Sequence, residues 1–168
     1  MLSSPSIAKA PITTVLGDGR LSLARDRDTR YDVLVLDAYS SDAVPVHLLT
    51  REAVKLYLAR LAPGGVLAFH VSNRHLDLRP VVAALAKDAK LPCLLDDDLK
   101  LPPDAYGAGR FPTRLLVAAK DRADLGALAS DPRWVAPPLR HDLRIWTDDD
   151  SSILPLIASN ALAATPAR

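Results

Sequence analysis

The chain alternates between short apolar runs, which predict strands, and apolar positions at helical spacing, which predict helices. The clearest strand is residues 31–37, where the run from Val33 to Leu36 is continuously apolar. Such a run is typical of a strand covered on both faces of a parallel sheet. This strand ends on a carboxylate, Asp37. Further strands are predicted at residues 12–16, 66–71, 92–95 and 114–119.

Helices are predicted between these strands. Thr50 is a suitable N-cap, and Glu52 lies in the first turn, where the helix dipole favours a negative charge. Apolar side chains then follow at helical spacing up to Leu61, and the Pro-Gly-Gly sequence at 63–65 is expected to stop this helix. A second amphipathic helix is predicted at residues 78–89, and shorter ones at 21–25, 121–129 and 151–157.

The order of these elements predicts an α/β fold with a mainly parallel sheet flanked by helices. We expect one domain over residues 12–157, preceded by a flexible lead-in at 1–11 and followed by a flexible tail at 158–168. A nucleotide-binding α/β fold normally begins with a Gly-rich turn between a strand and a helix. No Gly-x-Gly-x-x-Gly is found, so the chain starts where the second half of such a fold would start.

Composition narrows the classes of function. The 168 residues are 49% apolar and 24% charged, with a net charge of +1, so no overall field selects nucleic acid or a membrane surface. Aromatic residues are scarce, which argues against base stacking on single strands. The single cysteine, Cys93, excludes an internal disulfide and is interpreted as a small buried apolar residue. No apolar run or leader-like segment predicts membrane insertion or secretion, so we expect a cytoplasmic protein.

The candidate chemistry centres on carboxylates. In open α/β sheets, ligands bind beyond the carboxyl ends of the strands, where Asp37 is predicted to lie. Asp42 follows on a short loop, and two carboxylates at such a place suit a cationic substrate such as an amine. The alternative is that Asp37 caps a neighbouring loop and Asp42 forms a turn. Asp18, between Gly17 and Gly19, is likewise a natural turn residue.

Other polar residues are interpreted more simply. His70 closes a strand at the same sheet edge as Asp37 and is either a general base or a hydrogen-bonded core histidine. No two histidines have metal-ligand spacing, and with one cysteine we predict no metal site. The acidic runs at 96–98 and 148–150 are typical of solvated loops, with cation binding as the other interpretation.

Five segments together resemble the C-terminal half of the spermidine synthase family, the polyamine aminopropyltransferases. The resemblance is strongest to the branch that is fused to membrane segments in bacteria, and the match at residues 37–50, Asp-Ala-Tyr-Ser-Ser-Asp-Ala-Val-Pro-Val-His-Leu-Leu-Thr, is its most specific part. The segments are Val15-Leu-Gly-Asp-Gly-Arg-Leu-Ser-Leu23, residues 31–49, residues 50–61, Leu67-Ala-Phe-His-Val-Ser-Asn-Arg-His-Leu-Asp-Leu78 and Trp146-Thr-Asp148.

The resemblance implies a Rossmann-like, methyltransferase-like fold and the transfer of an aminopropyl group from decarboxylated S-adenosylmethionine to a diamine. That nucleoside would be a cosubstrate, with no tightly bound cofactor and no metal. Asp37 would take the proton from the attacking amine, and Asp42 would hold an ammonium of the polyamine. Tyr39 and Ser40 would belong to the loop that closes over the site. Asp18, with Gly17 and Gly19 beside it, would contact the adenine.

The chain also departs from that family. In full-length members the Gly-rich turn and the acidic residue that holds the ribose precede the equivalent of Ile12. We therefore expect weak or no transferase activity from this chain alone, with a companion chain or a second copy as partner. Two other hypotheses stay open. One is an S-adenosylmethionine-dependent methyltransferase of the same general fold. The other is a non-catalytic interaction module whose open sheet edge recruits another strand.

Overall fold

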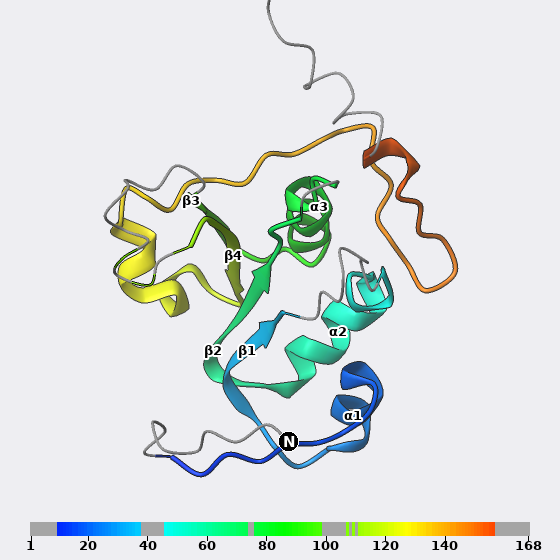
Figure 1. Ribbon diagram of the computed structural model, residues 1–168, viewed down its shortest axis with the longest axis vertical. Helices are drawn as coiled ribbons and strands as arrows, with labels where there is room; N and C mark the ends of the chain where they lie inside the picture. The colour runs from blue at the N-terminus through cyan, green and yellow to red at the C-terminus, as the bar shows by residue number, and fades with distance from the viewer. Residues whose placement is uncertain are drawn as a thin grey trace, which may run out of the picture.

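One four-stranded sheet forms the centre of the computed structural model, which describes residues 10–37, 46–73, 76–98, 107, 109 and 111–156 (Figure 1). The strand order is β1 (Tyr31–Leu36), β2 (Leu61–His70), β4 (Thr113–Ala119) and β3 (Cys93–Asp98). β1 and β2 are parallel, whereas β4 is antiparallel to both β2 and β3. The expected α/β fold is confirmed. The expected parallel sheet is confirmed in part, because β1, β2 and β3 share one direction and β4 runs against them.

Helices cover both faces of this sheet (Figure 1). Helices α1 (Gly19–Arg25), α2 (Arg51–Arg60) and α3 (Arg79–Asp88) lie on one face, and the 3-10 helix η2 (Arg122–Ser130) lies on the other. A short 3-10 turn, η1 (Val46–Leu48), precedes α2. The order of strand, helix and strand that the apolar pattern predicts is therefore present from β1 to β3.

The two faces of β2 bury alternate side chains. Leu67 and Phe69 pack with α2 and α3 in the larger core, whereas Ala68 packs with Val117 and with Leu125 of η2. This alternation follows from the two-residue period of a strand. Trp146, from the irregular segment that follows η2, completes the larger core with 3% of its surface exposed.

The N-cap that the sequence predicts for α2 is confirmed. Thr50 has an extended backbone, and its Oγ1 accepts a hydrogen bond from the amide of Ala53 at 3.2 Å. Glu52 lies in the first turn, and Arg60 is the last residue of the helix. In α3, Pro80 occupies the first turn, where its missing N–H leaves no hydrogen bond unmade.

The Pro-Gly-Gly sequence has a different role from the predicted helix stop. The helix already ends at Arg60, and residues 63–65 lie inside β2. Tyr31 is opposite Leu61 and Val33 is opposite Val66, so two steps along β1 face five steps along β2. The extra residues form a bulge. At Gly65 an added Cβ would lie 2.8 Å from the carbonyl oxygen of Tyr31, which leaves room for glycine only.

The predicted strand at residues 12–16 is wrong. These residues have no regular secondary structure, and the side chains of Ile12, Val15 and Leu16 are 69%, 69% and 91% exposed. β-Branched residues favour a strand only where another strand offers hydrogen bonds and a packing surface. Within the described part of the chain, β1 pairs with β2, and residues 12–16 pair with neither.

The remaining elements agree with the sequence except at their ends. β3 extends to Asp98, three residues beyond the predicted strand, and η2 is a 3-10 helix interrupted at Gly126, whose φ is +54°. The predicted helix at 151–157 is a single turn at residues 154–156. No helix in the described part of the chain combines the length and the apolar character that crossing a membrane requires.

Candidate functional site

Asp37 and His70 meet at the carboxyl ends of two parallel strands. Leu36 is paired with Phe69, so the next residue on each strand is Asp37 and His70. The Oδ1 atom of Asp37 lies 2.7 Å from Nδ1 of His70. The side chain of Asp37 is 60% exposed and that of His70 is 30% exposed. A carboxylate that a neighbouring side chain fixes in place, and that solvent and ligands can still reach, can receive a proton from a bound molecule.

A hydroxyl and a peptide group hold His70 from its other side. The Nε2 atom lies 2.8 Å from Oγ of Ser72, and the same Oγ accepts a hydrogen bond from the amide of Arg114 at 2.8 Å. The amide of Val71 in turn donates to the carbonyl of Arg114 at 2.9 Å. β4 therefore fixes the segment that follows β2, and this segment fixes the imidazole.

An open groove of about 420 Å³ reaches Asp37 of this pair. It is lined by β1, with Asp37 at the end of that strand, and by Gly19 and Leu23 of α1. Tyr57 of α2 also lines it and is 2% exposed. Its hydroxyl donates to the carbonyl of Leu48 at 3.0 Å, and burial raises the pKa of this phenol well above its usual value. Tyr57 is thus a fixed and neutral part of the groove.

Asp18 caps α1 rather than lining that groove. Its Oδ1 accepts a hydrogen bond from the amide of Leu21 at 2.8 Å, and its Oδ2 lies 3.1 Å from Nε2 of His47. The amide of Leu21, followed by His47, lowers the pKa of Asp18 below its usual value. Gly17 has a φ of +129°, which favours glycine, and Gly19 begins the helix. The structure therefore brings Gly19 and Asp37 to one groove, and places Asp18 beside a second hollow with His47.

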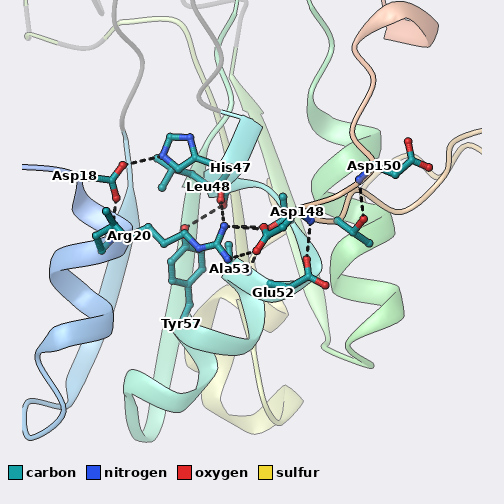
Figure 2. A network of polar contacts seen from close by, with 12 residues as sticks. Asp18, Arg20, His47, Leu48, Glu52, Ala53, Tyr57, Asp148 and Asp150 are labelled. Carbon is teal, nitrogen blue, oxygen red and sulfur yellow. Dashed lines mark hydrogen bonds and ion pairs between the residues drawn. The ribbon is translucent and has the colours of Figure 1, made fainter.

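Arg20 and Asp148 form the centre of a larger polar network (Figure 2). Two nitrogens of the guanidinium lie 2.7 Å from the two carboxylate oxygens, and Arg20 also donates to the carbonyl of His47 at 2.7 Å. The hydroxyl of Thr50 donates to Asp148 at 2.8 Å, and the amide of Asp148 donates to Glu52 at 3.0 Å. Hydrogen bonds from Arg20 and then Thr50 lower the pKa of Asp148 to about 2.

This network attaches three parts of the chain to one another. α1 contributes Arg20, the start of α2 contributes Thr50 and Glu52, and the C-terminal segment contributes Asp148. The guanidinium is 18% exposed and its partner carboxylate 42% exposed, so the pair is partly shielded from water. Its effect on the site is to fix α1, and with it one wall of the groove.

The other residues that the sequence suggests for the site have different places in the structure. Tyr39, Ser40 and Asp42 lie outside the described residues. In the first acidic run, Asp97 forms ion pairs with Arg79 and Arg114, which neutralise its charge. Burial raises the pKa of the Cys93 thiol to about 12, which keeps it protonated and unreactive at neutral pH. Among the described residues, no group of three or more potential ligands could hold a metal ion.

Three participants were not identified as such from the sequence. No local pattern in the sequence assigns a role to His47, Ser72 or Arg20. His47 contacts Asp18, 29 positions away, and Arg20 contacts Asp148, 128 positions away. Ser72 contacts His70, two positions away. The one local signal is the spacing of His70 and Ser72, because side chains two residues apart at the end of a strand point to the same side.

No protein-family model matches this sequence, and no curated protein is significantly similar to it. The resemblance of the five sequence segments to a known family therefore stays a prediction.

Proposed function

We propose that this chain is a spermidine synthase-like domain for the transfer of an aminopropyl group from decarboxylated S-adenosylmethionine to a diamine, with weak or no activity until a companion chain or a second copy completes the site. The observation that carries the proposal is the exposed carboxylate of Asp37 at the carboxyl end of β1, where it lines the groove. A ligand site at the carboxyl ends of parallel strands is the usual one in α/β sheets.

The proposed reaction needs a base and two positioned reactants. A protonated amine has no lone pair, so it attacks only after it gives up a proton, and Asp37 would receive that proton. The nitrogen lone pair forms a bond to the carbon beside the sulfonium. The carbon–sulfur bond breaks with its electron pair on sulfur, which releases methylthioadenosine. The sulfonium is a good leaving group, so most of the remaining catalysis would come from holding both reactants in line.

The size and lining of the groove support this proposal. Its volume of about 420 Å³ falls within the range of small-molecule sites, about 300–1,000 Å³. Leu23, Leu34 and Leu36 give it an apolar wall for a nucleoside, and Asp37 places a negative charge where an amine would lie. Gly19 lines this groove, and Asp18 lines the second hollow at the start of α1. By resemblance to the family, the Gly17-Asp18-Gly19 turn would contact the adenine.

The test is calorimetric titration of the full chain with methylthioadenosine, followed by an assay of aminopropyl transfer with a diamine. Binding in the micromolar range would support the proposal, and the transfer assay, in which this chain alone is expected to be weak, then measures the chemistry. Absence of binding at millimolar nucleoside, in a sample shown to be folded by circular dichroism, would contradict it. A methyltransferase of the same general fold would instead consume S-adenosylmethionine and release S-adenosylhomocysteine, which the same assay distinguishes.

One observation favours a second candidate, an interaction module that binds another chain. Val33 and Val35 on β1 are 56% and 59% exposed, on the face of the sheet that η2 covers only over β2, β4 and β3. Exposed apolar side chains on a strand favour association with another chain. A concentration-dependent mass in light scattering that Val33→Thr with Val35→Thr abolishes, without nucleoside binding, would favour this candidate over the transferase.

A further inference from the structure

We propose that His70 is a positioning residue for Asp37, and that Ser72 holds its ring in the tautomer that carries a proton on Nδ1. The functional part of this inference rests on the proposed role of Asp37 as the base. The structural part rests on three contacts in series. These are the amide of Arg114 to Ser72 at 2.8 Å, Ser72 to His70 at 2.8 Å, and His70 to Asp37 at 2.7 Å.

The direction of these hydrogen bonds follows from what each group can donate. The amide of Arg114 can only donate, so Oγ of Ser72 accepts there and keeps its own hydrogen for a second partner. An ionised carboxylate can only accept, so Nδ1 of His70 carries the hydrogen in the contact with Asp37. A neutral imidazole has one N–H, so its Nε2 accepts from Ser72. Each of the three contacts then has one donor and one acceptor.

This arrangement fixes the orientation of the carboxylate. The imidazole engages Oδ1 of Asp37, so the proton of an attacking amine is received at Oδ2. The ring cannot turn away without breaking its bond to Ser72, and Ser72 is attached to the backbone of β4. A base that is more than half exposed would otherwise sample several rotamers, so a fixed support shortens the search for the reactive geometry.

The same three side-chain types, in the same order, occur in serine hydrolases, where the hydroxyl is the nucleophile. Two observations favour support over nucleophilic attack here. Oγ of Ser72 already accepts a backbone hydrogen bond, and the carboxylate is exposed rather than buried behind the ring. Labelling of Ser72 by a fluorophosphonate probe would therefore contradict this inference, and no labelling is expected.

The first test reads the tautomer directly and needs no activity. ¹⁵N NMR of the imidazole rings in the full chain, at a pH where they are neutral, is expected to show His70 protonated on Nδ1 and not on Nε2. In Ser72→Ala and in Asp37→Asn the ring should shift toward the Nε2-protonated form. His141, an exposed loop histidine, is the internal control, and its signals should stay unchanged. An Nε2-protonated His70 in the wild type would overturn the inference.

The second test compares two substitutions of the same ring in the transfer assay. His70→Ala removes the donor and is expected to lower kcat between about tenfold and a hundredfold, with KM for the nucleoside unchanged. His70→Gln retains an amide N–H that can reach Asp37, and should recover most of the loss. If Asp37→Asn is inactive while His70→Ala keeps full activity, the positioning role is wrong and the proposed function stands. If the wild type neither binds nucleoside nor transfers, the proposed function fails, and the tautomer alone decides the structural part.

Discussion

Asp37 and His70 occupy matching positions on two neighbouring parallel strands, each one residue beyond the paired Leu36 and Phe69. Parallel strands bring their carboxyl ends to one edge of the sheet, so residues that are 33 positions apart in the chain become direct neighbours. The contact depends on the register of the two strands. If one strand slipped by one residue, its side chain would turn to the opposite face of the sheet and the contact would be lost.

Asp37→Asn is expected to lower kcat for aminopropyl transfer by at least about a hundredfold, because an amide cannot accept the proton of the amine. Affinity for methylthioadenosine should stay within about twofold, since the groove is otherwise intact. Steady-state assay and calorimetry measure the two quantities. Asp32→Asn is the matched control, an exposed carboxylate on the same strand, and should be as active as the wild type. Equal activity of Asp37→Asn and the wild type would contradict the role of Asp37.

Substitutions of Asp18 can separate its capping role from contact with a nucleoside. Asp18→Ala removes the hydrogen bond to the amide of Leu21 and is expected to lower the melting temperature. Asp18→Asn keeps an oxygen for the cap, so its melting temperature should be close to that of the wild type. If both variants lose binding of methylthioadenosine, the carboxylate contacts the ligand. If Asp18→Asn binds normally, Asp18 acts only through the helix.

Gly65→Ala is expected to reduce the free energy of unfolding by about 1–3 kcal/mol, because a Cβ would lie 2.8 Å from the carbonyl oxygen of Tyr31. Backbone atoms surround the site, so the structure can relieve the overlap only by moving β1 or β2. Chemical denaturation monitored by circular dichroism measures the change. Gly107→Ala is the control, since nothing lies within 4 Å of its added Cβ, and it should have little effect. Undiminished stability of Gly65→Ala would show that the bulge does not require glycine.

The ion pair between Arg20 and Asp148 is expected to make stability depend on acid pH. The pKa of Asp148 is about 2 in the folded protein and about 3.9 in an unfolded chain. The contribution of Asp148 is therefore present above pH ~4 and is lost as the pH falls toward 2. Asp148→Asn should lower the free energy of unfolding by about 1 kcal/mol at neutral pH, a value suited to a partly exposed pair.

The difference between the wild type and Asp148→Asn should shrink as the pH falls from 5 to 2, which urea denaturation at several pH values would measure. Asp150→Asn is the control, because Asp150 is 63% exposed and lies 3.6 Å from an exposed Arg144. A difference between the wild type and Asp148→Asn that is constant over this range would contradict the assigned pKa.

Local signals in the sequence predicted what depends on neighbours along the chain. Thr50 and the apolar positions after it define α2, and the apolar run before Asp37 defines β1, because caps and periodicity are encoded within a few residues. Features that depend on a distant partner were missed. Residues 12–16 have strand-forming side chains but no strand beside them, and the direction of β4 is not encoded in its apolar pattern.

The candidate site divides in the same way. Asp37 could be identified because it ends a recognisable strand, and His70 because it ends the next one. The role of Ser72 depends on the backbone of Arg114, 42 positions later, and no local pattern indicates that pairing. Asp18 illustrates the opposite case. Its position between two glycines indicated a turn residue, and the structure assigns it the N-cap of α1.

The ion pair between Arg20 and Asp148 also has a consequence for folding kinetics. The two residues are 128 positions apart, so their contact closes a long loop at a cost in chain entropy. Contacts of such long range are expected to form after the rate-limiting step. Loss of this pair should therefore accelerate unfolding and leave the folding rate nearly unchanged. The C-terminal segment would then attach late in folding, and its attachment would lengthen the lifetime of the folded protein.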